Sequence, residues 1–195
     1  MKVIILKMDK VCAVVDAQGY YIRGRFYARE AAFVSDTIGH CQEFNPNIRW
    51  SSLTKKEEGS IYKVRSKIHA LSLNVFKNKQ SIIPPAEHMI NYLKTFHKML
   101  ATEEKPYVAV KNKWLKDELE KAEIPYIDLD DSKYGFPSIN EIEKLYNNTW
   151  LCSYHCKVKP RRQDESTFKC ASRKCYNLWH YIKAYKAPLV QEMQE

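Results

Sequence analysis

The sequence is poor in glycine, and the few glycines form none of the loops that bind nucleotide phosphates. There are 5 glycines among 195 residues, and no glycine-rich nucleotide-binding pattern is recognisable around them. No Ser/His/Asp arrangement for nucleophilic catalysis is recognisable either. Nothing in the chain therefore indicates a P-loop enzyme, a dinucleotide-binding enzyme or a serine hydrolase.

Long apolar runs are also missing. No segment approaches the roughly 20 apolar residues that span a membrane. The apolar start at Met1–Leu6 is too short for a signal-peptide core and is interrupted by Lys7–Lys10. We therefore expect no membrane partner and an intracellular location, nuclear or cytoplasmic. Internal repeats, low-complexity tracts and persuasive linkers are absent as well, so residues 1–195 are expected to form a single domain.

Acidic residues are fewer than basic ones. Lys and Arg total 32 against 23 Asp and Glu, which gives a formal net charge of +9 and a pI near 9.1. Such an excess favours a polyanionic partner such as nucleic acid, although many small basic proteins bind no polyanion. The 13 Tyr and 4 Trp argue against disorder.

The first third of the chain predicts an antiparallel meander followed by a basic helix. Strands are predicted at 11–16, 26–34 and 40–44, with a hairpin around Gly24 and with Gly19 as a turn directly after Asp16. The helix at 54–73 has a capping box and apolar residues at helical spacing. Its exposed face is predicted to be positive through Lys55, Lys56, Lys63, Arg65 and Lys67.

Strands and helices alternate in the rest of the chain. Strands are predicted at 107–110 and 124–127, and helices at 89–100, 111–122, after Ser138 and before Pro188. Trp114, Leu115 and Leu119 are predicted to face inward. This alternation implies crossover connections. The fold class is therefore α/β, with a mixed sheet of three antiparallel strands followed by βαβ units and flanked by helices, an order that matches the ribonuclease H-like architecture.

Three short motifs resemble those of the DEDD (DnaQ-like) 3′–5′ exonucleases of the ribonuclease H-like superfamily. They are residues 14–19 (VVDAQG), residues 108–115 (VAVKNKWL) and the segment from Phe168-Lys169-Cys170-Ala171 to Leu178. The chain is also similar to uncharacterised arthropod and mobile-element- or virus-associated proteins. This resemblance implies a site with two divalent metals held by several carboxylates.

The departures from this pattern predict a catalytically degenerate member. Asp16 stands at the first acidic position, but Gln18, Leu115 and Cys170 fall where the other carboxylates belong. One carboxylate cannot hold two hard cations, so Asp16 is read as the relic of a catalytic site. Mg²⁺ or Mn²⁺ is implied only if the protein is an active exonuclease with unconventional ligands. The alternative for Asp16 is a carboxylate that accepts hydrogen bonds at a turn.

A cysteine–histidine cluster near the C-terminus predicts a structural zinc site. Its spacing is close to that of zinc sites, with Cys156, His180 or the pair His40 and Cys41 as alternatives for one ligand. The simpler alternative is that the cysteines are small buried side chains. The predicted ligands are Cys152, His155, Cys170 and Cys175.

The same region, 150–187, carries a basic loop and the final helix. Its positive side chains are predicted to contact the phosphates of nucleic acid, although four of these residues also fit an unspecific nuclear-localisation signal. A domain that binds protein partners, of viral or mobile-element origin, is a further alternative. The predicted nucleic-acid-binding residues are Lys157, Lys159, Arg161, Arg162, Lys169, Arg173 and Lys174.

Overall fold

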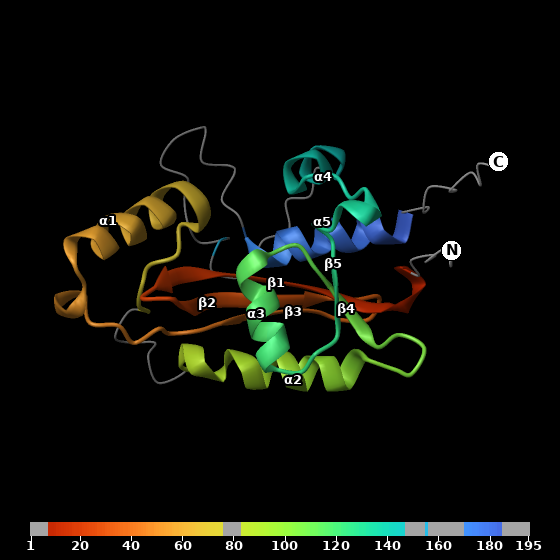
Figure 1. Cartoon of the computed structure of the whole chain (residues 1–195), viewed down its shortest axis with the longest axis horizontal. Helices are drawn as coiled ribbons and strands as arrows, with labels where there is room; N and C mark the ends of the chain where they lie inside the picture. The colour runs from red at the N-terminus through yellow and green to blue at the C-terminus, as the bar shows by residue number, and fades with distance from the viewer. Residues whose placement is uncertain (1–7, 76–82, 147–154, 156–169, 185–195) are drawn as a thin grey trace.

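A single mixed sheet organises the protein (Figure 1). The computed structural model describes residues 8–75, 83–146, 155 and 170–184. Within these residues the strands have the order β3-β2-β1-β4-β5. β1, β2 and β3 are antiparallel neighbours, whereas β4 is parallel to β1 and β5 is parallel to β4. The predicted meander followed by parallel strands is confirmed. The strands are β1 Val11–Ile22, β2 Arg25–Val34, β3 Gly39–Glu43, β4 Tyr107–Val110 and β5 Tyr126–Asp128.

Helices cover both faces of this sheet. In Figure 1, α2 lies on one side of the strands and α1, α4 and α5 lie on the other, with α3 crossing in front. One apolar core joins the sheet to α2 and α3, and a second joins it to α4 and α5. A third, smaller core lies between α1 and the distal half of β1. The helices are α1 Lys55–Val64, α2 Met89–Leu100, α3 Lys113–Lys121, α4 Ile139–Leu145 and α5 Ala171–Ala184.

The central strand β1 is apolar on both faces because it is covered from both sides. Ala13, Val15 and Ala17 belong to the α2/α3 core, while Val14 belongs to the α4/α5 core. Since side chains alternate along a strand, Asp16 faces the same side as Val14, toward α5. The only carboxylate of β1, that of Asp16, therefore lies on the face of the sheet that α5 covers.

The prediction that β1 ends at Asp16 and turns at Gly19 is wrong. β1 continues to Ile22, and the pairing with β2 shifts between Gln18 and Gly19. The hairpin turns at Arg23 and Gly24, which have φ values of 50° and 75°, as a two-residue type I′ turn requires. Gly19 is needed for a different reason. A Cβ atom there would meet the Tyr27 carbonyl oxygen at 2.2 Å.

The predicted helix at 54–73 is shorter than expected. Its capping box between Thr54 and Glu57 is confirmed, but α1 passes into a π-helical turn at Arg65–His69 that ends at Ala70, whose φ is 56°. A π turn inserts an extra residue into the helical repeat. Consequently Ile68 is 37% exposed, whereas His69 is buried.

The N-terminal caps of the later helices explain where they begin. Asn112 accepts hydrogen bonds from the backbone of α3, and Ser138 forms the predicted capping box of α4 with Glu141.

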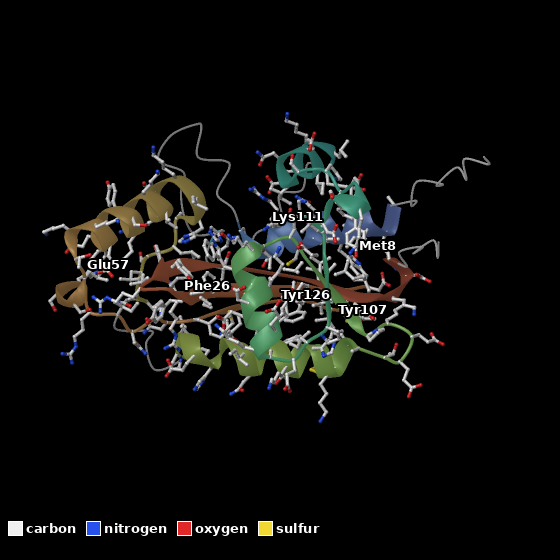
Figure 2. The ribbon with its side chains drawn as sticks, in the orientation of Figure 1. Met8, Phe26, Glu57, Tyr107, Lys111 and Tyr126 are labelled. Atoms are coloured by element: carbon white, nitrogen blue, oxygen red, sulfur yellow. The ribbon has the colours of Figure 1, made fainter. Side chains whose placement is uncertain are left out.

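Phe26 and Tyr126, both labelled in Figure 2, pack against the α2/α3 core. No helix among the described residues is long and apolar enough to cross a membrane.

Candidate functional site

Asp16 lies at the centre of a buried network of hydrogen bonds. Its carboxylate is inaccessible to solvent. Lys174 Nζ donates to Oδ1 over 2.9 Å, and Asn112 Nδ2 donates to the same oxygen over 2.9 Å. Gln18 Nε2 donates to Oδ2 over 2.9 Å. Three side chains from β1, α5 and the start of α3 therefore satisfy both carboxylate oxygens without a metal ion.

Each partner is held in place by its own element. Lys174 lies in the first turns of α5, and its ammonium also donates to the Lys111 carbonyl oxygen over 3.0 Å. Asn112 caps α3 with its oxygen and donates its amide to the Ala17 carbonyl as well as to Asp16. The buried negative charge of Asp16 is thus balanced by an ammonium, the condition under which a buried carboxylate is tolerated.

The motif alignment locates only part of this site. Gln18 contacts Asp16 as the alignment implies, but Leu115 is fully buried in the α2/α3 core and Cys170 belongs to a different cluster. The turn interpretation of Asp16 is wrong because the residue lies within β1, although it does accept hydrogen bonds. A shifted alignment would place Asp117, two residues after Leu115, or Asp164, upstream of Cys170, at the missing carboxylate positions. Asp117 is exposed, and Asp164 lies outside the described residues.

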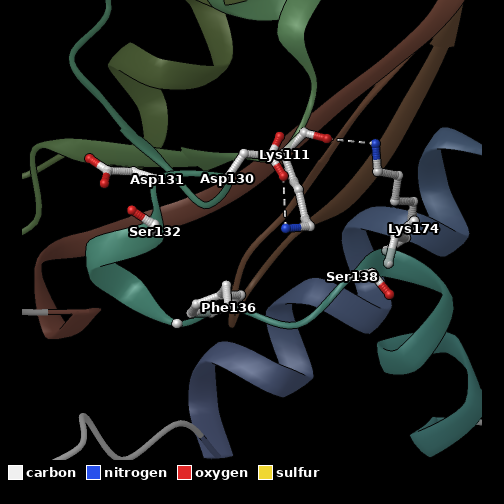
Figure 3. A pocket seen from close by; sticks show the side chains of 9 residues that line it. Lys111, Asp130, Asp131, Ser132, Phe136, Ser138 and Lys174 are labelled. Atoms are coloured by element: carbon white, nitrogen blue, oxygen red, sulfur yellow. Dashed lines mark hydrogen bonds and ion pairs between the residues drawn. The ribbon is translucent and has the colours of Figure 1, made fainter.

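A polar cleft of about 530 Å³ adjoins the Asp16 network (Figure 3). Lys174 lines this cleft, whereas Asp16 does not. Lys111 and Asp130, both in its lining, form an ion pair of 2.8 Å. A cation entering the cleft would therefore meet the Lys174 ammonium before it reached the Asp16 carboxylate. The full lining consists of Lys111, Asp130, Asp131, Ser132, Gly135, Phe136, Ser138, Ile139 and Lys174.

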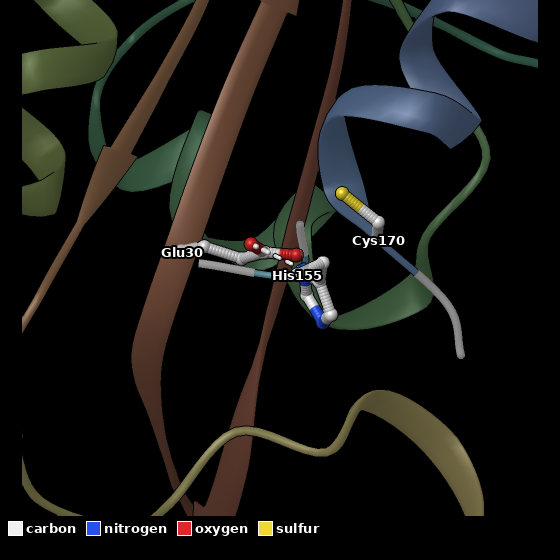
Figure 4. A group of neighbouring side chains, drawn as sticks. All are labelled: Glu30, His155 and Cys170. Carbon is white, nitrogen blue, oxygen red and sulfur yellow. Dashed lines mark ion pairs between the residues drawn. The ribbon is translucent and has the colours of Figure 1, made fainter. Parts of the chain in front are cut away.

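A second cluster of buried polar residues lies at the start of α5 (Figure 4). The ligand atoms of Glu30, His155 and Cys170 all lie within 4.8 Å of one another, and all three residues are buried. Glu30 Oε2 is 3.5 Å from His155 Nδ1, and Glu30 Oε1 accepts a 2.7 Å hydrogen bond from the Ala171 backbone. Among the described residues, no other group of three or more Cys, His, Asp or Glu side chains meets this distance criterion, and Asp16 is not part of it.

The imidazole of His155 is held between this cluster and the backbone. Its Nε2 donates to the His69 carbonyl oxygen over 2.7 Å, which leaves Nδ1 facing Glu30 and Cys170. Burial lowers the pKa of His155, but the contacts with Cys170 and Glu30 outweigh burial and raise it to about 11. The cluster therefore favours the protonated imidazole, and a metal ion bound at Nδ1 would have to displace the proton there.

The predicted zinc ligands are only partly brought together. His155 and Cys170 meet, whereas Cys175 is buried against the Ala32 carbonyl of β2 and lies outside the group. Burial raises the pKa of the Cys175 thiol well above its usual value, so it behaves as a small core side chain. Cys152 and the alternative ligand Cys156 lie outside the described residues.

Glu30, which sequence reasoning missed, takes the place of one predicted cysteine. Its signal was a pair of adjacent charged residues, Arg29 and Glu30, in the middle of strand β2. Of the alternative ligands, Cys41 is close to Glu30, with Sγ 4.0 Å from Oε2. His40 instead bonds Tyr92 at 3.0 Å, and His180 is exposed.

Of the predicted phosphate contacts, the structure describes Arg173 and Lys174, and neither is exposed. Lys174 is buried and its ammonium pairs with Asp16 and the Lys111 carbonyl oxygen, which corrects its predicted role as an exposed phosphate contact. Arg173 is mostly buried and lies 4.0 Å from Glu143. The remaining predicted residues lie outside the described ranges: Lys157, Lys159, Arg161, Arg162 and Lys169.

A basic surface is present on α1 and the π turn that follows it. The predicted positive face of this segment is exposed throughout. Its residues are Lys55, Lys56, Lys63, Arg65 and Lys67.

Comparison of the chain with protein-family models, with curated proteins and with solved structures finds no match.

Proposed function

We propose that this protein is a ribonuclease H-like domain of the exonuclease type that binds nucleic acid without hydrolysing it. The observation that carries the proposal is the buried contact of 2.9 Å between Lys174 Nζ and Asp16 Oδ1. Metal-dependent phosphodiester hydrolysis needs divalent cations at this carboxylate. Here an ammonium group supplies the positive charge that Asp16 requires.

The order of the strands supports the choice of fold. Three antiparallel strands followed by two parallel ones, with the central strand carrying the acidic residue, is the arrangement that the motifs of the exonuclease type imply. The net charge of +9 and the exposed lysines and arginine of α1 and its π turn support a polyanionic partner. The function is then retention or presentation of nucleic acid.

Binding to a fluorescently labelled oligonucleotide tests this proposal. We expect affinity that survives a chelator and falls steeply between about 50 and about 200 mM salt, because each neutralised phosphate releases counterions. The double variant Lys63→Glu/Lys67→Glu, on α1 and the π turn that follows it, should weaken binding. Lys94→Glu/Lys98→Glu makes the same charge change at exposed positions of α2 on the other side of the sheet, and it should weaken binding less.

The same samples test the enzymatic alternative. With Mg²⁺ or Mn²⁺ the labelled oligonucleotide should stay intact, since Asp16 has no neighbouring carboxylate cluster in the described part of the chain. Metal-dependent degradation that is lost in Asp16→Asn would favour an active exonuclease. Absence of binding at low salt would overturn the binding proposal.

We also propose that the cluster of Glu30, His155 and Cys170 holds a structural zinc ion. Thiolate, imidazole and carboxylate are the ligands that zinc takes in proteins. Bonds of about 2.0–2.2 Å at a tetrahedral angle separate nitrogen and oxygen ligands by about 3.3–3.5 Å, which matches the 3.5 Å between His155 Nδ1 and Glu30 Oε2. The hydrogen bond from Nε2 to a backbone carbonyl is the usual support of a metal-bound histidine. Zinc would link β2 to the start of α5.

Metal analysis of protein purified without chelators tests the zinc proposal. We expect about one zinc per chain, and its removal should lower the melting temperature by roughly 5–10 °C, since zinc stabilises only the folded chain. Glu30→Gln should lose the metal. Glu118→Gln is a suitable control because Glu118 is also buried but pairs with Lys121 on α3.

Cys41→Ser determines whether this thiol, 4.0 Å from Glu30, completes the site. Loss of zinc in this variant would make Cys41 the fourth ligand. A wild-type protein that lacks zinc and is not stabilised by added zinc would contradict the proposal.

A further inference from the structure

An exposed pair of stacked aromatic rings lies beside the Asp16 network. Tyr21, near the end of β1, and Trp114, in the first turn of α3, have ring centroids 4.4 Å apart and an interplanar angle of 25°. They are 47% and 40% exposed. The prediction that Trp114 faces inward is wrong, because Leu115 and Leu119 form the buried stripe of α3 and Trp114 lies off that stripe.

The position of Trp114 is fixed by the polar network beneath it. Asn112 Oδ1 accepts a hydrogen bond of 3.1 Å from the Trp114 backbone, while the Asn112 amide is anchored on Asp16 and Ala17. Tyr21 is positioned from the other side by the hairpin, whose Arg23 forms an ion pair with Glu57 of α1. The Asn112 cap and the hairpin therefore hold the two rings together at the surface, outside the apolar core.

Positive charge accompanies this aromatic surface. The Lys113 ammonium lies 5.5 Å from the centroid of the Trp114 ring, and no carboxylate of the described residues lies within ion-pair distance of it. Aromatic rings flanked by basic groups are the elements with which proteins stack unpaired bases and contact their phosphates.

We infer that Tyr21 and Trp114 form a stacking platform for a base of single-stranded nucleic acid. The inference rests on the proposed function and specifies its substrate class, because the bases of a duplex are stacked on each other and unavailable to a ring on the protein surface. Lys113 contacts the phosphate next to the stacked base. The platform adds recognition of single strands to the charge-driven binding by α1.

Fluorescence anisotropy with a single-stranded oligonucleotide and with a duplex of the same sequence tests the platform. Trp114→Ala and Tyr21→Ala should each weaken single-strand binding about ten- to a hundred-fold, the range expected for losing one base stack, and leave duplex binding unchanged. Trp114→Phe should retain most of the single-strand affinity. Met99→Ala, at a side chain that is 61% exposed on α2, should change neither affinity.

The outcomes separate the platform from the proposed function. If wild-type protein binds neither oligonucleotide at low salt, nucleic-acid binding itself is wrong. If it binds and Lys63→Glu/Lys67→Glu weakens binding while Trp114→Ala does not, only the platform is wrong. Equal losses of single-strand and duplex affinity in Trp114→Ala would also overturn it, as would a preference of this surface for a peptide over any oligonucleotide. Unchanged thermal unfolding of the variants confirms that the fold is intact.

Discussion

Replacing Lys174 with methionine is expected to lower the free energy of unfolding by about 3–5 kcal/mol, because it leaves a buried carboxylate without its counter-charge. Asp16 is fully buried, and Lys174 provides the only ammonium that the described residues place on it. Asn112 and Gln18 would remain as donors, but amides cannot neutralise the charge. Urea-induced unfolding of the wild type and the variant measures the loss.

Two further variants show whether burial is the cause. Asp16→Asn/Lys174→Met removes both charges and should recover most of the loss, since a neutral replacement of a buried pair is often tolerated. Lys183, on the same helix as Lys174, pairs over 2.7 Å with Asp36 of the loop between β2 and β3, and both side chains are half exposed. Lys183→Met breaks this pair. That change should reduce stability by less than about 1 kcal/mol. Similar small losses in Lys174→Met and Lys183→Met would contradict the account of Asp16.

The fold was predictable because its signals are local. The hairpin at Gly24, the capping boxes at Thr54 and Ser138, and the apolar run of β4 each depend on a few adjacent residues. The errors arose where tertiary contacts override such signals. Gly19 was predicted to form a turn, but it lies within β1, where the Tyr27 carbonyl oxygen leaves no room for a side chain. The π turn places His69 in a buried position that a regular helix does not predict.

The candidate site was less predictable because its partners are distant in sequence. Asp16 was recognised from its strand, but Asn112 and Lys174 lie 96 and 158 residues away. Charge patterning assigned Lys174 to the surface together with its basic neighbours. A lysine in the first turns of an amphipathic helix can face either way, and only the register of α5 on the sheet decides it.

The second cluster shows the same limit. Cys170 and His155 were selected by spacing, whereas Glu30 was not, because strand β2 meets α5 only in the folded chain. Glu30 did carry a sequence signal. Charged residues such as Arg29 and Glu30 in the middle of a strand need partners if they are buried, since an isolated buried charge is strongly unfavourable. That rule indicates that a partner exists but cannot name His155 or the start of α5.

Gly19→Ala is expected to destabilise the protein by about 3 kcal/mol or more, because β1 and β2 approach too closely there for any side chain. The added Cβ would lie 2.2 Å from the Tyr27 carbonyl oxygen and 2.9 Å from the Ala28 Cα, both of them backbone atoms that cannot rotate away. Separating the strands would also strain the 3.1 Å hydrogen bond between the Gly19 carbonyl and His69 Nε2. The loss should appear as a lower urea midpoint with the α1 end of the sheet disturbed.

Gly59→Ala is the matched control for this prediction. Gly59 lies within α1, and a Cβ there meets no atom within 4 Å. The same substitution should therefore stabilise the protein by about 0.5–1 kcal/mol, because alanine loses less backbone freedom in a helix than glycine. Opposite signs for the two variants would establish that the close contact between β1 and β2, and not the loss of glycine as such, sets the requirement at position 19. A Gly19→Ala variant as stable as the wild type would contradict this account, because it would mean that β1 and β2 leave room for a side chain at position 19.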